Sequence, residues 1–409
     1  MDRVFLGFSN RQLAMTKDTT TVQKSQNKLL IVYVCTILTL CTLYAVQPIQ
    51  PLFEAEFSLT RFQAVIFTTV IMLPLGIAPI AYGYLLETFS SKRLLRFSIL
   101  WLGILEICFA FSDTYWLLLS IRGLQGLVIP AILTSLMSYI SFMSPRELVQ
   151  KAIGVYIGST IVGGFAGRFF SGLFSDMFGW RFFFALLGVL LFVMFWMLRY
   201  VDEDVKINFA KPQLSQISKV LHNRAFLLLY LSMFCIFFVF QGVLNFLPFW
   251  LNSFSAEVSH SKVGLVYAGY IVGFVISLKV LQIIKFFGSE TRSMFIGGFI
   301  YLLGVQIFHL KSYGIIFGGM FVFCAGMFIV HSIASGYINK LAETNKAISN
   351  GLYLSFYYAG GTLGTFIPGF FYEKLGWDAF LHVLSGVIVL GLFLLLALKL
   401  HVRRICKHL

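Results

Sequence analysis

The sequence predicts an all-α membrane protein, with twelve transmembrane helices in two six-helix, pseudo-symmetric halves and both termini in the cytoplasm. Three observations predict this class. Hydrophobic residues make up 58% of the 409 residues and charged residues 12%, with a mean hydropathy of +0.86, whereas a soluble domain carries about 25% charged residues. Apolar runs of roughly 17–25 residues, the length that crosses a bilayer core, recur along the chain. Lys and Arg gather in alternate segments between these runs.

The apolar runs form two groups of six around a charged linker. We assign 1–28 as a cytoplasmic N-terminal tail, 29–199 as the first half, 200–224 as a cytoplasmic linker, 225–400 as the second half and 401–409 as a basic cytoplasmic tail. Such an arrangement indicates two repeats. Within the linker, 213–221 can form an amphipathic surface helix. The predicted spans are 29–49, 62–86, 94–112, 116–140, 152–174, 182–199, 225–251, 263–284, 293–310, 312–336, 350–372 and 378–399.

The positive charges fix the orientation. Cytoplasmic loops carry the excess of Lys and Arg, and few fall on the other side: Arg61, Arg181, Lys262, Lys311 and Lys374. The net charge of +14 therefore follows from topology and implies no nucleic-acid partner, although the basic face can contact lipid headgroups. The cysteines show no paired spacing, so we expect neither disulfides nor a metal site. No signal peptide is evident, and Met15 is an alternative start.

The end of the first span contains Pro48 and Pro51. Proline removes a backbone donor and interrupts a helix. We therefore expect a broken helix there, with carbonyl groups that protein or water must satisfy.

A charged turn joins the second and third spans. Gly83 and Glu87 precede it, and Lys92 and Arg93 follow it. Charges this close to hydrocarbon are costly unless they are paired or hydrated, so we interpret these four residues as a conformational latch. The alternative is an ordinary cytoplasmic loop whose Lys and Arg follow the positive-inside rule.

Two charges fall inside the hairpin of the third and fourth spans. Glu106 and Arg122 are each about eight residues from its turn near 113–115, so a 1.5 Å rise per residue places them at similar depth. We predict that they pair, and that Glu106 carries protons. The alternative is a purely structural pair that neutralises two costly charges.

The fifth span carries four regularly spaced glycines and one cation. Small residues at such steps allow helices to approach closely, so we predict a packing hinge at Gly154, Gly163, Gly167 and Gly172. The cation, Arg168, can line a cavity as a binding or gating group, or it can cap carbonyls of a neighbouring helix. Gly179-Trp180-Arg181 before the sixth span is echoed by Gly376-Trp377-Asp378 before the twelfth, which supports the repeat.

These motifs resemble those of major facilitator superfamily transporters. The loop over 83–95 is similar to the family's loop between its second and third helices. Arg122 followed by Gln125-Gly126 resembles the motif on its fourth helix, and the glycines of the fifth span resemble its antiporter motif, with Arg168 in place of a proline. The resemblance extends over 29–400. Four segments resemble the acriflavine-sensitivity and arabinose-efflux branch: Val-Gln-Pro-x-x-Pro-Leu-Phe at 46–53, Asn-Phe-Leu-Pro-Phe at 245–249, His-Ser-Ile-Ala-Ser-Gly at 331–336 and Tyr-Tyr-Ala-Gly-Gly at 357–361. The resemblance implies a proton-linked role for Arg122.

The resemblance also implies a central cavity between the first, fourth, seventh and tenth spans and their neighbours. Candidates for proton coupling are Glu106, Arg122, Arg168 and His331. The imidazole of His331 titrates near neutral pH, although it can equally be a neutral group bonded to a neighbouring helix. Candidates for substrate contact are polar or aromatic: Tyr44, Gln47, Gln50, Arg122, Arg168, Phe240, Gln241, Asn245, His331 and Tyr357.

We therefore predict a monomeric, proton-coupled secondary transporter in a bacterial inner membrane. It exports a small amphipathic drug, metabolite or siderophore by alternating access and uses no cofactor. The sequence contains no phosphate-binding Gly-rich loop, which would indicate a transporter driven by ATP, and no His-Glu-x-x-His motif, which would indicate a metalloprotease. One alternative is a proton-coupled uptake symporter for a nutrient. A membrane-embedded lipid-modifying enzyme is a remote second, because the sequence lacks paired acids or a nucleophile with a base.

Overall fold

The computed structural model describes residues 28–88, 91–144, 149–201, 214–254, 258–342 and 346–408, and all regular structure in these ranges is helical. Eight helical segments of this described part are long and apolar enough to cross a membrane. The chain is thus an all-α membrane protein, as the sequence predicts.

The first part of the chain, up to residue 201, forms long helices joined by short turns. A first helix covers 28–44. The elements that follow are η1 (Gln47–Ile49), α2 (Gln50–Glu56), α3 (Arg61–Thr88), α4 (Ser91–Ala110), α5 (Tyr115–Met143), α6 (Val149–Phe178), α7 (Trp180–Met197) and η2 (Leu198–Tyr200).

The second part begins with α8 (Leu214–His222), a short helix close to the predicted amphipathic segment. The elements after it are α9 (Arg224–Phe254), α10 (His260–Val266), η3 (Tyr267–Gly269), α11 (Tyr270–Leu278), α12 (Val280–Phe287), α13 (Glu290–Ile307), α14 (Tyr313–Leu341), α15 (Lys346–Gly364) and α16 (Ile367–His408).

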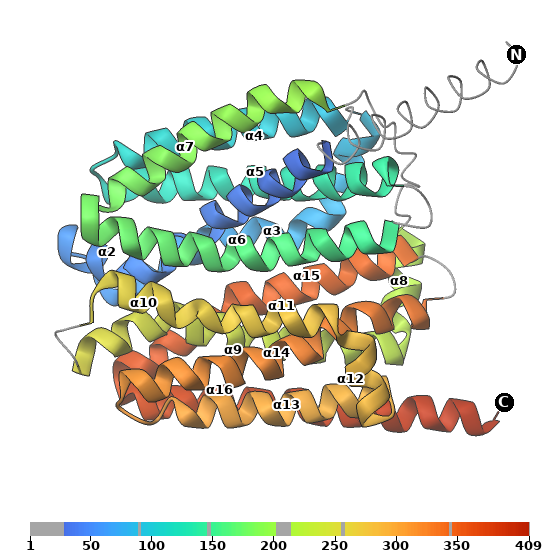
Figure 1. Ribbon diagram of the computed structural model, residues 1–409. Coiled ribbons are helices and arrows are strands. Elements are labelled where there is room, and N and C mark those ends of the chain that lie inside the picture. The colour runs from blue at the N-terminus through green and yellow to red at the C-terminus, as the bar shows by residue number, and fades with distance from the viewer. Residues whose placement is uncertain are drawn as a thin grey trace, which may run out of the picture.

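The two parts form the two layers of one elongated bundle (Figure 1). Helices α4 to α7 lie in one layer, and α9 to α14 with α16 lie in the other. The layers meet where α3 packs on α15, where α6 packs on α10 and α11, and where η1 and α2 pack on α9. Figure 1 shows α2 at one end of the bundle and α8 at the other, so we name these the α2 end and the α8 end.

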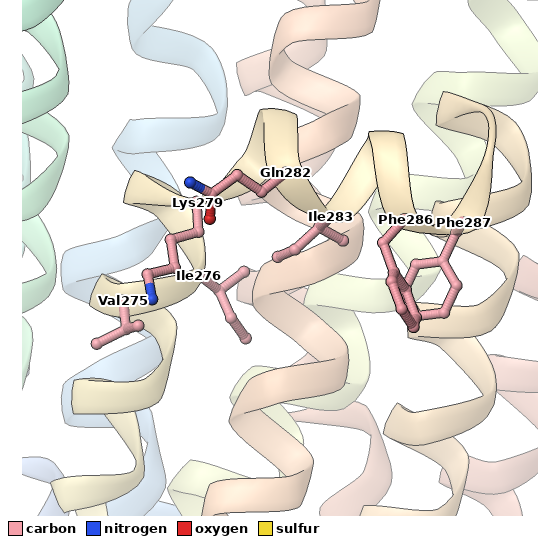
Figure 2. A pocket seen from close by; sticks show the side chains of 7 residues that line it. All are labelled: Val275, Ile276, Lys279, Gln282, Ile283, Phe286 and Phe287. Atoms are coloured by element: carbon pink, nitrogen blue, oxygen red, sulfur yellow. The ribbon is translucent and has the colours of Figure 1, made fainter.

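The predicted single span over 263–284 is wrong in detail, because the chain breaks twice. A 3₁₀ turn, η3, separates α10 from α11, and Lys279 (φ −105°, ψ 14°) separates α11 from α12. Figure 2 shows α12 running across the direction of α11 and α13. In α12, Gln282 and Lys285 lie on one face and apolar residues on another. That pattern suits a helix at a bundle end better than one crossing lipid.

The predicted span over 350–372 is also interrupted. Helix α15 ends at Gly364, and α16 begins at Ile367, directly before Pro368. Proline at an early helical position favours a helix start, because its missing N–H would be unpaired there in any case.

The Gly-Trp echo is a real structural repeat. Gly179 and Gly376 both have φ of 83°, a left-handed value that favours glycine, and each precedes a tryptophan. The Trp180 indole donates to Glu56 Oε2 at 2.7 Å, and the Trp377 indole donates to the Phe308 carbonyl at 2.8 Å. The two layers therefore reuse the same local turn at the α2 end.

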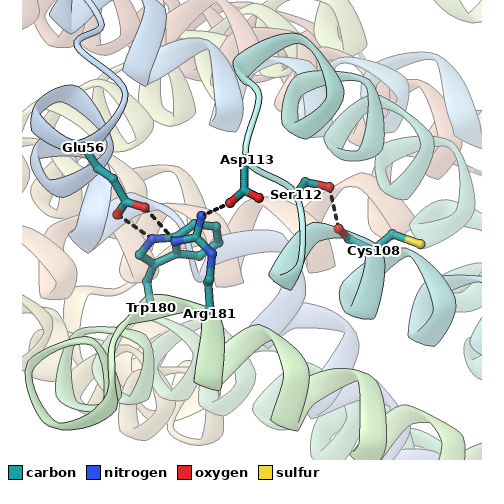
Figure 3. Close-up of polar contacts among 6 residues, drawn as sticks. All are labelled: Glu56, Cys108, Ser112, Asp113, Trp180 and Arg181. Atoms are coloured by element: carbon teal, nitrogen blue, oxygen red, sulfur yellow. Dashed lines mark hydrogen bonds and ion pairs between the residues drawn. The ribbon is translucent and has the colours of Figure 1, made fainter.

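The residue after each tryptophan is charged and pairs with the neighbouring helical hairpin. Arg181 contacts Glu56 at 2.6 Å and Asp113 at 2.5 Å (Figure 3). In the other layer, Asp378 contacts His309 at 2.7 Å. The residue after the tryptophan is thus charged in both layers, but it is positive in the first (Arg181) and negative in the second (Asp378).

Candidate functional site

The first helix breaks where the sequence predicts. It ends at residue 44, and a turn over 45–46 leads into η1, which contains Pro48. Buried backbone groups need hydrogen-bond partners, and side chains from two other helices supply them. Arg122 of α5 donates to the Thr42 carbonyl at 3.0 Å and to the Leu43 carbonyl at 3.1 Å. Ser171 of α6 donates to the Ala45 carbonyl at 2.5 Å.

Arg122 is fully buried, and its guanidinium donors are occupied. Besides the carbonyls at the break, Nη1 donates to Gln125 Oε1 at 2.9 Å and Nε donates to the Phe67 carbonyl at 3.4 Å. Its guanidinium carbon is 5.8 Å from the centre of the Phe109 ring. Arg122 thus connects α5, α3 and the broken first helix.

Glu106 lies beside this arrangement without a direct bond to Arg122. The two residues interact electrostatically, but no ion pair within 4 Å joins them. Both Glu106 carboxylate oxygens are buried beside the Thr42 hydroxyl and the Gln125 amide, although none of these groups forms a hydrogen bond of good geometry with the carboxylate. The predicted pair is thus an electrostatic interaction and not an ion pair, because Arg122 directs its donors to the carbonyls of the helix break. What remains is a buried carboxylate next to unpartnered polar groups.

Amide side chains connect the two layers near this break. Gln47 Nε2 donates to Gln241 Oε1 at 3.1 Å, and Gln241 Nε2 donates to the Tyr44 hydroxyl at 3.4 Å. Gln50 Nε2 donates to Asn245 Oδ1 at 2.7 Å and to Thr68 Oγ1 at 2.8 Å. The structure thus brings five of the predicted substrate contacts into two neighbouring networks, one of Tyr44, Gln47 and Gln241 and one of Gln50 and Asn245.

Arg168 of α6 is the second fully buried arginine. Its Nε donates to Gln47 Oε1 at 2.7 Å, and its Nη1 donates to the Gly164 carbonyl of its own helix at 2.6 Å. Its Nη2 is buried and has no hydrogen-bond partner. The guanidinium is therefore held through Nε and Nη1, while Nη2 keeps its hydrogen-bonding capacity unused.

Three tyrosine rings surround the Arg168 guanidinium. The ring centres of Tyr44, Tyr270 and Tyr267 lie 4.0, 4.9 and 5.1 Å from its central carbon. Tyr267 and Tyr270 come from the second layer and were not among the predicted residues. Their spacing of three positions, which places two side chains on one helix face, is the signal that could have indicated them.

Phe240, Tyr357 and His331 form an aromatic cluster in the second layer. Phe240 lies 5.6 Å from Tyr270 between ring centres, which links the cluster to Arg168. His331 stacks on Tyr357 at 4.6 Å, and its Nδ1 is 3.0 Å from the hydroxyl of Tyr353. In the described ranges, His331 forms no hydrogen bond or ion pair with Glu106, Arg122 or Arg168. The four predicted proton-coupling residues therefore fall into separate groups.

The four predicted hinge glycines differ in their surroundings. A Cβ at Gly163 would lie 2.5 Å from the Ile37 carbonyl, and one at Gly167 would lie 2.6 Å from the Cys41 carbonyl, both on the first helix. A Cβ at Gly172 would lie 2.2 Å from the carbonyl of His260, in the other layer. Gly154 has open space. Of the four predicted hinge glycines, Gly172 is thus the one that lies against the other layer.

The layers are joined tightly at the α2 end. The carboxylate of Asp176 accepts from the backbone N–H groups of His260 at 3.1 Å and Ser261 at 2.7 Å, and also from the Ser261 hydroxyl. Where α3 meets the end of α15, the hydroxyl groups of Thr69 and Thr365 form a hydrogen bond of 2.8 Å. Arg61 lies over the ring of Tyr372 at 4.7 Å. This set of contacts, the α2-end seam, closes that end of the bundle.

The predicted latch falls partly outside what the structure describes. Gly83 and Glu87 belong to α3, but their side chains lie outside the described residues, whereas Lys92 and Arg93 begin α4 with partly or largely exposed side chains. In the second layer, Lys340 contacts Glu290 at 2.6 Å, joining the end of α14 to the start of α13.

A pocket of about 420 Å³ lies at the elbow between α11 and α12, away from the central network (Figure 2). Lys279 and Gln282 contribute its polar atoms, and the rest of its lining is apolar. It contains none of the predicted substrate contacts.

Comparison with known proteins gives a consistent result. A family model described as the Major Facilitator Superfamily matches residues 32–347. The chain is 28% identical over 370 residues to the inner membrane transport protein YnfM of Escherichia coli (strain K12), covering 89% of this chain and 88% of that protein. It is 27% identical over 366 residues to an uncharacterized transporter of Buchnera aphidicola subsp. Schizaphis graminum, covering 88% and 87%. It is 24% identical over 367 residues to the uncharacterized MFS-type transporter YybF of Bacillus subtilis (strain 168), covering 87% and 89%.

Solved structures share the fold, and a nucleoside transporter is an example. A crystal structure of a mutant of the nucleoside transporter NupG superimposes with a TM-score of 0.74 at 14% sequence identity, covering 91% of this chain and 99% of that chain. At this identity the likeness concerns the fold alone.

Proposed function

Because the chain belongs to the Major Facilitator Superfamily, we propose that it is a proton-coupled secondary transporter that exports a small amphipathic compound by alternating access. As a member of this family it is a multi-pass membrane transporter of a small molecule and not an enzyme. We place it as a monomer in a bacterial inner membrane, with twelve spans, both termini in the cytoplasm, halves at 29–199 and 225–400, and a linker at 200–224.

The observation that carries proton coupling is the environment of Glu106. Its carboxylate is completely buried, and neither oxygen has a hydrogen-bond partner. Although the Thr42 hydroxyl and the Gln125 amide lie nearby, a buried charged carboxylate without well-formed hydrogen bonds is costly inside a membrane, and binding a proton removes that cost. Arg122 interacts electrostatically with Glu106, so this interaction changes when Glu106 binds a proton. Since Arg122 holds the carbonyls of the broken first helix, a proton on Glu106 alters the forces on that helix.

The α2-end seam supports alternating access. The contacts of Asp176, Gly172 and Thr69 with the second layer close one end of the bundle. Exposing a central site to that end requires these contacts to break. We propose that the Gly83, Glu87, Lys92 and Arg93 latch stabilises the opposite closure, and that reversing the charge of Glu87 favours the state closed at the α2 end.

The substrate site is proposed to lie between the layers at the amide network. Its contacts are drawn from the groups predicted from the sequence: Tyr44, Gln47, Gln50, Arg122, Arg168, Phe240, Gln241, Asn245, His331 and Tyr357. Gln47 and Gln241 come from different layers and bond to each other, so a compound that binds them contacts both moving parts.

The test is transport in inside-out vesicles energised with a proton gradient. A panel of dyes, drugs, sugars and iron chelators is added while proton release and compound accumulation are followed together. Accumulation coupled to proton efflux supports export. Uptake in right-side-out vesicles with no response in inside-out ones would replace the proposal with a nutrient symporter.

A further inference from the structure

Three charged side chains in the described part of the chain are completely shielded from solvent: Glu106, Arg122 and Arg168. Glu106 and Arg122 interact and offset each other's charge. Arg168 has no carboxylate within ion-pair distance among the described residues. A buried positive charge without a counter-charge is costly in a membrane, so the central region carries one unbalanced cation.

We propose that the transported compound is an organic anion, and that its carboxylate or phosphate oxygen binds Arg168. This inference rests on the proposed function, because it assigns a charge to the compound that the central site carries. It names a narrower class than amphipathic compounds in general, which include neutral and cationic molecules.

The bonds of Arg168 leave one nitrogen, with two N–H groups, for that anion. Nε is taken by Gln47 and Nη1 by the carbonyl of Gly164, which fix the plane of the guanidinium. Nη2 is the donor that remains without a partner. A guanidinium is a planar fork that matches the oxygens of a carboxylate or phosphate. The orientation is thus set before the anion arrives.

The three tyrosine rings explain how Arg168 is tolerated while no anion is bound. Aromatic faces attract a cation through their quadrupoles, and Tyr44, Tyr267 and Tyr270 supply such rings at 4.0–5.1 Å. That attraction is weaker than a charge-assisted hydrogen bond. The tyrosine rings therefore offset the positive charge of Arg168 only in part, whereas a bound anion balances it, and this difference favours binding.

The same surroundings disfavour the other charge classes. A cation would be repelled by Arg168, and repulsion is strong in a low dielectric. A neutral compound would leave the charge of Arg168 unbalanced. Tyr270 and Phe240 lie 5.6 Å apart and offer aromatic surface to an apolar body, so we expect an anionic group attached to a flat or apolar skeleton.

The first experiment identifies what the protein exports. Cells that produce the full-length protein and cells that lack it are compared by untargeted mass spectrometry of the medium, and every compound that depends on the protein is sorted by its charge at neutral pH. Anionic compounds support the inference. Neutral or cationic compounds would overturn it and leave the proposed export standing. Identical media would overturn the proposed export, and the inference with it.

The second experiment assigns the anion to Arg168. Export of the identified anion and of its neutral amide analogue is measured in proteoliposomes. In Arg168→Gln, export of the anion should fall at least tenfold relative to its amide. Arg168→Lys, which keeps the charge, should restore part of that preference. Arg292→Gln, at an exposed arginine, should behave as the parent protein. Equal loss of both compounds in Arg168→Gln would show a structural role and overturn the assignment.

Discussion

Gly172 lies directly against His260, with so little space between the two layers that a Cβ at Gly172 would come within 2.2 Å of the His260 carbonyl oxygen. The neighbouring Asp176 caps the first backbone N–H groups of α10. This contact defines how close α6 and α10 can come at the α2 end, and it gives the first prediction.

Replacing Gly172 with alanine should force the seam apart. Overpacking costs about 1–3 kcal/mol, which corresponds to roughly a 5- to 150-fold shift in the ratio of two states. We expect the state open at the α2 end to gain population. The measurement is maleimide labelling of Thr365→Cys, a buried seam position, in a background whose six native cysteines are replaced by alanine. Gly154→Ala is the matched control, because Gly154 has open space. Equal labelling in both variants would contradict the prediction.

Replacing Glu106 with glutamine should separate transport from the proton gradient. The amide cannot bind and release a proton, but it fills the same buried space. We expect concentrative transport to disappear while exchange of unlabelled for labelled substrate continues. Both are measured in proteoliposomes. Glu373→Gln, at an exposed acid, is the control and should leave both activities intact. Concentrative transport that survives in Glu106→Gln would rule out this proton carrier.

Replacing Arg122 with methionine should destabilise the protein. The carbonyls of Thr42 and Leu43 would lose their donors, and each unsatisfied buried acceptor costs about 1–3 kcal/mol. We therefore expect a loss of about 2 kcal/mol or more, seen as a lower melting temperature in detergent. Arg292→Met, at an exposed site, should melt like the parent. An unchanged melting temperature in Arg122→Met would show that the helix break does not depend on this side chain.

The Glu290–Lys340 contact predicts a small acid sensitivity at the α8 end. The hydrogen bond from Lys340 holds the pKa of Glu290 below its ordinary value of 4.5. A carboxyl group whose pKa is lowered by folding adds stability above its unfolded pKa, and that stability is lost as the pH falls through the folded pKa. Since Lys340 is largely exposed, the contribution is below about 1 kcal/mol.

That contribution can be measured by comparing melting temperatures of the parent and Lys340→Gln between pH 7 and pH 3. The difference between the two proteins should be present at pH 7 and should vanish toward pH 3. Lys399→Gln, at a lysine outside the Glu290–Lys340 contact, serves as the control and should show no such trend. A difference that grows on acidification would contradict the sign worked out above.

The sequence predicted the all-helical membrane fold because a lipid solvent leaves few choices. Inside a bilayer every backbone group must be satisfied within the chain, so long apolar runs become helices. The break in the first helix was also predictable, because Pro48 cannot donate a backbone hydrogen bond. The bend at Lys279 was not, since the apolar run continues through it and only packing decides where it turns.

The site was predictable in its members more than in its pairings. Gln47, Gln241 and Arg168 were identified as polar groups on apolar spans, and the structure brings them together. The depth of Glu106 relative to Arg122 followed from helix geometry, but the direction of the Arg122 donors depends on the fold of another helix. The spacing of Tyr267 and Tyr270 places them on one helix face, but an apolar run does not show whether that face meets lipid or an arginine.

The reversed charges after the two Gly-Trp turns have a consequence for assembly during membrane insertion. Arg181 bonds to Asp113, whereas Asp378 bonds to His309. If the hairpins of the two halves were exchanged, Asp113 would meet Asp378, so that two negative charges would face each other. Two halves built on the same turn are thus kept from recognising each other's partners. The charge on each hairpin thus favours contact with the Gly-Trp turn of its own half.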